Sequence, residues 1–146
     1  MRAEQQITPY TIPTTAERLI AATGVGAIVA GSGLVMYFDP STVRFLPVCP
    51  LYTLTGFACP GCGLTRGFHA LFHGDVLTAL DFNALIPVWA VIFGYVLVSL
   101  VLLVVRGKGL PMWITRPAFL WTFMVVLLAF GVMRNLPIYP FTILFP

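Results

Sequence analysis

The chain has 146 residues, of which 59% are hydrophobic and 9% charged, with a mean hydropathy of +0.95 and a net charge of +3. Soluble domains carry about a quarter of their residues as Asp, Glu, Lys or Arg, so this chain lacks the charge to cover a water-facing surface. Its basic residues are scattered and form no dense stripe, which excludes a nucleic-acid surface. The composition therefore predicts an integral membrane protein with one domain, residues 1–146.

Three runs of residues without ionisable side chains follow one another along the chain. They cover Leu19 to Phe38, Phe82 to Val105 and Pro117 to Met133. Because a helix rises about 1.5 Å per residue, roughly 20 residues cross a 30 Å hydrocarbon core. We predict an all-α membrane protein with transmembrane helices at 19–38, 83–105 and 117–133, an outer loop at 39–82 and a connector at 106–116. The third run is at the lower length limit, and a buried or interfacial helix is its alternative.

The first run also needs to be distinguished from a cleaved signal peptide. Its apolar stretch is longer than the roughly 7–15 residues typical of such peptides, so we expect it to be retained. Thr14 or Thr15, with Glu17 in the following turn, can begin this helix. Small residues recur every four positions in two rows, Ala22, Gly26 and Ala30 in one and Ala27 and Gly31 in the other. Such rows let helices approach closely in lipid, although small residues are also common in membrane helices generally.

The basic residues predict the orientation in the membrane. Five belong to the N-terminal segment and the connector: Arg2, Arg18, Arg106, Lys108 and Arg116. Three belong to the predicted outer loop and the tail: Arg44, Arg66 and Arg134. By the positive-inside rule, the N-terminus and the connector lie in the cytoplasm, and the loop and the C-terminus lie outside a bacterial plasma membrane. The tail combines prolines with apolar residues, so we expect it to lie in the membrane interface or against another protein.

The outer loop contains all three cysteines of the chain, Cys49, Cys59 and Cys62, within fourteen residues. After them, Leu64 to Phe72 is predicted to form a short helix that Gly74 stops, and Asp75 is predicted to cap a second one that ends at about Leu80. The first of these helices is amphipathic, which is typical of helices lying along a membrane surface. Phe68, Leu71 and Phe72 share its apolar face, and Arg66, His69 and His73 share its polar face.

Three interpretations of the cysteines remain open at this point. A structural disulfide suits an oxidising outer compartment, and pairing Cys49 with Cys59 or Cys62 would leave one thiol free. Alternatively, CPGCG resembles the metal-binding knuckle of zinc ribbons, so the three thiolates with His69 or His73 could give the four ligands of a zinc site. The third interpretation is redox catalysis, because Cys62 near a helix N-terminus and Arg66 would be a better nucleophile.

The rest of the sequence offers no other catalytic pattern. It has no phosphate-binding glycine loop, no paired carboxylates within a span and no nucleophile–base order with motif context. The predicted spans contain no ionisable residue, which argues against a pump or an ion channel. We therefore expect no catalytic residue, and lipids as the associated small molecules.

The segment from Cys49 to Leu85 resembles an uncharacterised bacterial membrane-protein family with a Cys-Pro-x-Cys-Gly-x-Thr-Arg signature, a Gly-Asp turn and an Asn before a membrane helix. The positions that carry this motif besides the cysteines are Pro60, Gly61, Gly63, Thr65, Arg66, Gly74, Asp75 and Asn83. The chain departs from the pattern at Ala84, where the family usually has proline. The family has no established activity, so this resemblance supports the module and not a reaction.

The whole chain also resembles the prokaryotic respiratory supercomplex association factors, small subunits that join a cytochrome bcc complex to an aa3-type oxidase in actinobacteria. This resemblance implies a non-catalytic accessory subunit that packs against larger membrane subunits of a respiratory complex, and implies no cofactor of its own. The alternative is a membrane thiol-disulfide oxidoreductase that uses Cys59 and Cys62 of the CPGC motif.

Overall fold

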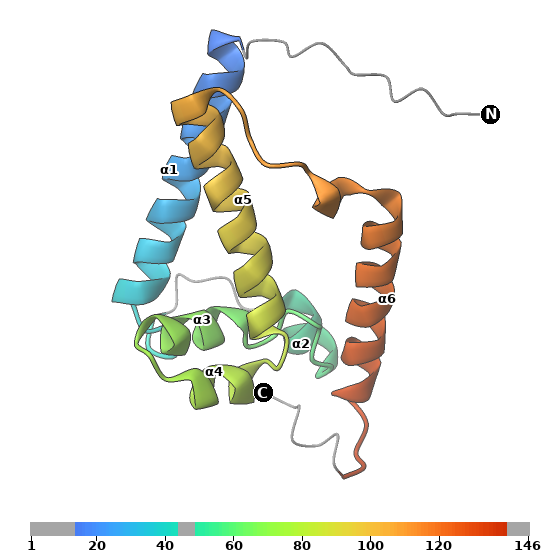
Figure 1. Cartoon of the computed structure of the whole chain (residues 1–146). Helices are drawn as coiled ribbons and strands as arrows, with labels where there is room; N and C mark the ends of the chain where they lie inside the picture. Colours follow the sequence, from blue (N-terminus) through green and yellow to red (C-terminus); the bar gives the residue numbers. More distant parts are fainter. Residues whose placement is uncertain (1–13, 44–48, 140–146) are drawn as a thin grey trace, which may run out of the picture.

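The computed structural model describes residues 14–43 and 49–139, and in this part of the chain every regular element is a helix (Figure 1). Two long helices, α1 and α5, lie side by side, and three short helices lie across one end of the pair. A third apolar helix, α6, stands beside them. The elements are α1 (Thr15–Tyr37), α2 (Pro50–Thr55), α3 (Leu64–Phe72), α4 (Val76–Phe82), α5 (Ile86–Arg106), the 3-10 helix η1 (Trp113–Thr115) and α6 (Pro117–Met133).

Helix α1 begins where the sequence predicts it. Thr14 and Glu17 form a capping box, in which the Glu17 amide donates to the Thr14 hydroxyl at 3.3 Å and the Thr14 amide donates to the Glu17 carboxylate at 2.9 Å. The helix has 23 residues and is apolar enough to cross a membrane. It ends at Tyr37, one residue before the predicted end, because Phe38 is already extended.

Helix α5 has 21 residues and also meets the length and apolarity needed to cross a membrane. It begins at Ile86, not at position 83 as predicted, because Asn83 has extended backbone and caps the end of α4. Pro87 lies within its first two positions, where few backbone donors are lost. Helix α5 packs along α1, and at Gly24 the two helices come close, since a β-carbon there would lie 3.1 Å from Leu100 Cδ1.

The predicted small-residue rows of α1 point away from α5. Ala22, Gly26, Ala30, Ala27 and Gly31 are all exposed in the described structure. A β-carbon on either Gly26 or Gly31 would meet nothing within 4 Å. Among the described residues, no other element therefore packs against this face of α1 at either glycine.

The segment after α5 folds back along that helix. The Leu110 amide donates to the Ser99 hydroxyl at 3.0 Å, and the Tyr95 hydroxyl donates to the Pro111 carbonyl at 2.6 Å. The Trp113 ring then packs edge-on against Tyr95 and Phe119. These contacts set the place where α6 begins.

Helix α6 has the predicted bounds, with Pro117 in its first turn. Its 17 residues make it shorter than the two helices that meet the length needed for a membrane span. The Phe123 ring reaches the Trp89 ring of α5 at a centroid distance of 5.2 Å, and Phe130 is the one buried residue of the helix. The rest of its apolar surface is largely uncovered within the described part of the chain.

The short helices α3 and α4 follow the sequence prediction closely. Helix α3 has the predicted bounds, and Gly74 after it has a φ of 81°, a conformation that favours glycine. Asp75 caps α4 by accepting from the Thr78 amide at 3.0 Å, and α4 continues to Phe82, past the predicted end at Leu80. Helix α2, which begins with Pro50, was not predicted.

Gly67 sets the packing between these short helices and α5. A β-carbon at this position would lie 2.7 Å from Ile86 Cδ1 and 3.1 Å from the Ala79 carbonyl oxygen. Ile86 and Ala79 are fully buried, so neither can move aside easily. The packing of α3 against both α4 and the start of α5 therefore requires a glycine at position 67.

We predict that Gly67→Ala lowers the stability of the purified protein by about 1–3 kcal/mol, because it overpacks this contact. The measurement is thermal unfolding in a mild detergent. Gly26→Ala is the matched control, since a β-carbon there meets nothing within 4 Å. The control should be neutral or stabilising by at most about 1 kcal/mol. Equal stability of the two variants would contradict the packing described here.

Candidate functional site

The three cysteines meet at one point beside the short helices. The Cys59 sulfur lies 3.2 Å from the Cys49 sulfur and 3.3 Å from the Cys62 sulfur, and all three lie within 4.8 Å of one another. Cys49 precedes α2, and Cys62 comes two residues before α3, so the starts of two helices and the turn between them converge here. The described residues thus place three sulfur ligands at metal-binding distance.

The predicted structural disulfide is wrong for this structure, because all three cysteines are free. A disulfide joins two sulfurs at about 2.05 Å, whereas the two shortest separations here are 3.2 and 3.3 Å. Cys59 is almost equally close to both of the other sulfurs, so no single pair is singled out. The arrangement is that of three groups around a common centre.

A tight turn holds Cys59 and Cys62 together. The Cys62 amide donates to the Cys59 carbonyl at 3.0 Å, and the Cys59 amide donates to the Cys62 sulfur at 3.2 Å. Gly63 follows with a φ of 81°, which only glycine adopts readily, and the Leu64 amide donates to the Gly61 carbonyl at 3.0 Å. These bonds orient both sulfurs toward the same side of the turn.

Asn83 anchors this turn from the other end of the loop. Its side chain is 1% exposed, and its amide nitrogen donates to the Pro60 carbonyl at 2.9 Å and to the Cys62 carbonyl at 3.1 Å. Its oxygen accepts from the Leu85 amide at 2.9 Å. A buried amide with three satisfied bonds is costly to replace, since each group left unsatisfied costs about 1–3 kcal/mol. This gives the predicted motif position a structural role.

Arg134 binds the same turn from α6. The residue is fully buried, and its Nη1 donates to the Cys59 carbonyl at 2.9 Å and to the Cys62 carbonyl at 3.0 Å. Its guanidinium also lies over the Phe130 ring at 5.1 Å. The Nε and Nη2 atoms are buried without a hydrogen-bond partner. Burial lowers the pKa of Arg134 and the nearby Cys62 and Cys59 oppose that shift, yet guanidinium stays charged in proteins.

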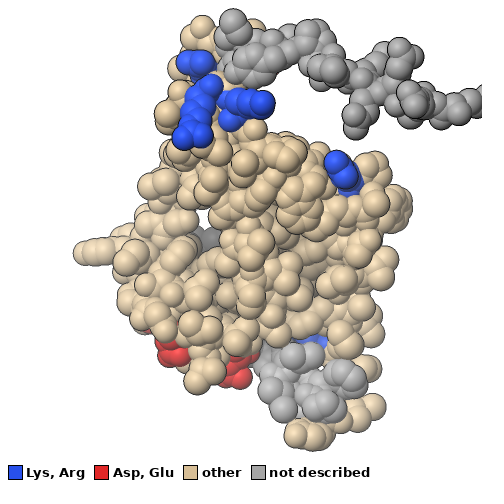
Figure 2. Space-filling view, viewed as in Figure 1, with Lys and Arg blue, Asp and Glu red and all other residues tan. Residues whose placement is uncertain are grey.

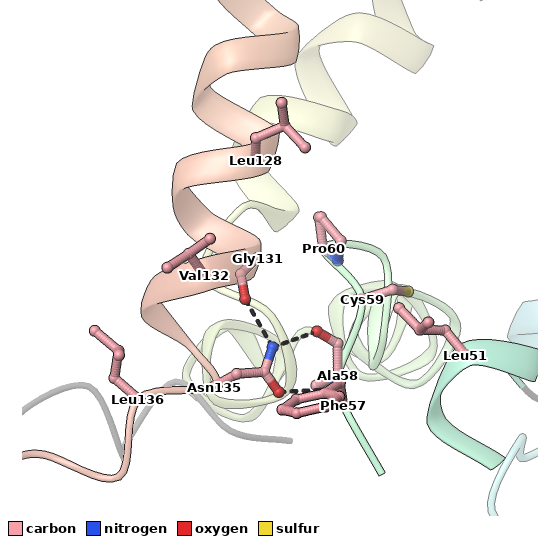
Figure 3. A pocket seen from close by; sticks show the side chains of 10 residues that line it. All are labelled: Leu51, Phe57, Ala58, Cys59, Pro60, Leu128, Gly131, Val132, Asn135 and Leu136. Atoms are coloured by element: carbon pink, nitrogen blue, oxygen red, sulfur yellow. Dashed lines mark hydrogen bonds between the residues drawn. The ribbon is translucent and has the colours of Figure 1, made fainter. Parts of the chain in front are cut away.

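Asn135 adds a second link between α6 and the cysteine loop (Figure 3). Its oxygen accepts from the Ala58 amide at 2.8 Å, and its nitrogen donates to the Ala58 and Gly131 carbonyls at 2.8 and 2.7 Å. The side chain thereby satisfies both backbone groups of Ala58. Above this link lies an open apolar groove of about 440 Å³, whose main lining residues are Leu51, Phe57, Pro60, Leu128, Val132 and Leu136.

The thiols of Cys49 and Cys62 differ in acidity. Cys49 is half-buried, and a hydrogen bond from the Tyr52 amide, aided by those from Cys59, Cys62 and Leu51, lowers the pKa of its thiol to about 7. Cys62 is buried, and desolvation together with the neighbouring Cys59 and Cys49 raises the pKa of its thiol to about 12. Desolvation penalises the charged form, whereas donated hydrogen bonds stabilise it. In the absence of a bound metal, the half-buried Cys49 thiol is therefore more reactive than the buried Cys62 thiol.

The predicted histidines lie elsewhere. His69 and His73 line a separate cavity of about 280 Å³ together with Arg66, Asp39 and Asp75. Their Nδ1 atoms lie 2.7 Å from the Val35 carbonyl and 2.8 Å from the His69 carbonyl, and neither ring joins the sulfur cluster. Arg66 lies over the Phe82 ring at 5.1 Å, and Thr65 is half-buried in α3.

No site role was predicted for Arg134 or Asn135. In the sequence they are marked only by position, since Arg134 is the first ionisable residue after the third apolar run and Asn135 follows it directly. A basic residue at that place is usually an interfacial anchor. Only the folded chain brings the end of α6 to the cysteine turn.

Comparison with known proteins agrees with the predicted module. Residues 49–97, which cover the cysteine loop and the first half of α5, match the model of a family described as a protein of unknown function, DUF2752. No curated protein and no solved structure matches the chain. The chain therefore carries, over about a third of its length, a module whose activity has not been assigned.

We predict that iodoacetamide modifies Cys49 faster than Cys62 in the folded, reduced, metal-free protein at pH 7. The lower pKa of Cys49 leaves far more thiolate, and after allowing for its weaker nucleophilicity the rates should differ by about 100-fold or more. Peptide mass spectrometry over a time course measures each site. In denaturing detergent the three rates should converge, and equal rates in the folded protein would refute the burial of Cys62.

Proposed function

We propose that this protein is a non-catalytic accessory subunit of a larger membrane complex, with an actinobacterial respiratory assembly of cytochrome bcc and aa3-type oxidase as the expected partner. The observation that carries the proposal is the amount of apolar side-chain surface left uncovered on the described helices. On this view the cysteine loop has a structural role and the helices supply the surfaces for lipid and partner subunits.

Helix α6 supports the proposal most directly. Trp121, Val125, Leu128 and Val132 are each at least 62% exposed, on a helix whose one buried residue is Phe130. A helix that is apolar all round needs either lipid or another protein around it. A seam of Phe119, Phe123, Leu127 and Phe130 faces the rest of the chain. The remaining surface is available to annular lipid and to a larger subunit.

The exposed rows of small residues on α1 offer a second contact surface. Because a β-carbon on Gly26 or Gly31 would meet nothing within 4 Å among the described residues, another helix could approach this face to backbone distance. Helix association in lipid depends on such close packing, since lipid tails are as apolar as side chains. This is the surface that we expect a partner helix to use.

We further propose that α1, α5 and α6 all cross the plasma membrane, with the cysteine loop outside. In Figure 2, most of the visible basic side chains gather at the end where α1 begins and the connector lies. Acidic side chains gather at the opposite end, and an uncharged belt separates the two. This distribution supports a cytoplasmic N-terminus and connector by the positive-inside rule.

The orientation can be tested with two introduced cysteines. Ser41→Cys lies in the exposed turn after α1, and Met112→Cys lies in the connector, where Met112 is 48% exposed. A membrane-impermeant maleimide applied to protoplasts should modify position 41, and position 112 only after the membrane is opened. Peptide mass spectrometry separates these sites from the native cysteines. Modification of position 112 alone in intact protoplasts would reverse the proposed orientation.

Co-purification tests the accessory role. We expect the tagged chain, extracted from its native membrane in a mild detergent, to carry haem-bearing subunits that absorbance and mass spectrometry identify. Gly26→Leu should reduce this recovery about tenfold or more, because it fills the surface where a partner helix would approach. Val29→Leu is the matched control, since Val29 is already 57% exposed and bulky. A wild-type chain that always elutes without haem-bearing partners would refute the proposal.

The thiol-disulfide oxidoreductase is the second candidate. The lowered pKa of Cys49 beside Cys59 favours it, because a thiolate is the nucleophile in disulfide exchange. Within the CPGC motif, however, Cys62 is buried and its thiol is weakly acidic, which makes it a poor attacking thiol. We therefore prefer the accessory role.

A further inference from the structure

The buried charge of Arg134 lacks a counter-ion among the described residues. The side chain is fully buried, only its Nη1 has hydrogen-bond partners, and no described carboxylate forms an ion pair with it. A buried charge costs several kcal/mol unless it is paired. Its hydrogen bonds reach the backbone of Cys59 and Cys62, so the closest groups that can become negative are the thiols of the cluster.

The spacing of the sulfurs fits one metal ion. Zinc binds thiolate sulfur at about 2.3 Å in a tetrahedral arrangement, which places the sulfurs about 3.8 Å from each other. The three sulfurs here lie within 4.8 Å of one another, and Cys59 lies 3.2 and 3.3 Å from the other two. Lengthening these two separations by about half an ångström would bring them to the distance expected around zinc. Because the thiols are free, no disulfide has to be reduced before the ion binds.

We propose that Cys49, Cys59 and Cys62 bind one zinc ion as three thiolates, and that Arg134 is the counter-charge of this centre. Binding displaces the protons that remain on the thiols and leaves the three thiolates and the divalent ion with one net negative charge. The fully buried guanidinium neutralises that charge. Monovalent copper also favours thiolates, but it would leave a net charge even with Arg134 in place.

The surrounding hydrogen bonds position the ligands for this role. Asn83 and Arg134 both donate to the Cys62 carbonyl, and Arg134 also donates to the Cys59 carbonyl, so both ligand-bearing peptides are held in place. Residues that orient metal ligands in this way typically contribute 10- to 100-fold to metal affinity. No described His, Asp or Glu side chain joins the cluster, so the proposal assigns the fourth position to water or another exogenous ligand.

The zinc site also affects how α6 is held. Arg134 belongs to the end of this helix, so zinc binding and the attachment of α6 to the cysteine loop are coupled. A filled site stabilises the buried guanidinium, and the guanidinium in turn favours the filled site. The zinc centre therefore helps to hold the end of α6 against the cysteine loop.

The test uses the full chain, purified in mild detergent with a non-thiol reductant. Elemental analysis should find one zinc ion per chain. Replacing zinc with Co²⁺ in the metal-stripped protein should produce sulfur-to-cobalt charge-transfer absorption and the strong visible bands of tetrahedral cobalt. Protein prepared with zinc available that contains no zinc and gives no such bands would overturn the proposal. Copper in place of zinc in the native preparation would overturn the choice of metal.

Variants separate the roles of the residues, with affinity measured by competition against a chelator. Arg134→Gln should weaken zinc binding about 10- to 100-fold, and Arg134→Lys, which keeps the charge, should weaken it less. Arg116→Gln is the matched control, because it removes an exposed charge at the other end of α6. His69→Gln should leave the affinity unchanged. Unchanged affinity in both Arg134 variants would refute the counter-charge, and the cobalt spectrum of the wild-type chain tests the site even if a variant fails to fold.

Discussion

The end of α6 and the cysteine turn are joined by a buried guanidinium, and much of the arrangement depends on this contact. Arg134 donates hydrogen bonds to the Cys59 and Cys62 carbonyls at the two ends of the CPGC turn. Asn135 bonds the backbone amide and carbonyl of Ala58, just before this turn. Together with the ring contacts of Phe123 with Trp89 and of Phe119 with Trp113, these bonds hold α6 to the described body of the protein. A charge placed there must be compensated, and among the described residues the cysteine thiols are the nearby groups that can become negative.

In the described part of the loop between α1 and α5, several polar groups are satisfied by contacts within the loop. Asn83 bonds three backbone groups, Gly67 lets α3 touch two neighbours, and the Gly63 turn closes the cysteine segment. Such a loop can lie at a membrane surface without exposing backbone donors to lipid. These contacts hold the cysteines in a defined arrangement, while the long helices present largely apolar surface.

The cysteine cluster shows why the chemistry of a thiol depends on its surroundings. Two of the three neighbouring thiols differ widely in pKa, because Cys49 accepts a backbone hydrogen bond and Cys62 is desolvated. The same closeness that makes Cys59 a neighbour of both sulfurs disfavours a single bonded pair and suits a shared ion. The proposed zinc ion and the proposed accessory role are compatible, since a bound ion would stabilise the shape of the cysteine loop for contact with a partner.

Local sequence determined most of the secondary structure: the Thr14–Glu17 cap, the bounds of α3 and α6, the Gly74 stop and the Asp75 cap all follow from side chains acting on nearby backbone. The long apolar runs likewise determined which segments avoid water. The start of α5 and the whole of α2 were not predicted, because Asn83 and Cys49 are held by contacts from distant parts of the loop. Tertiary structure alone decided that the cysteines are free, that the histidines face another cavity, and that Arg134 reaches the cysteine turn. These outcomes depend on which segments meet in space, and residue order does not encode that at short range.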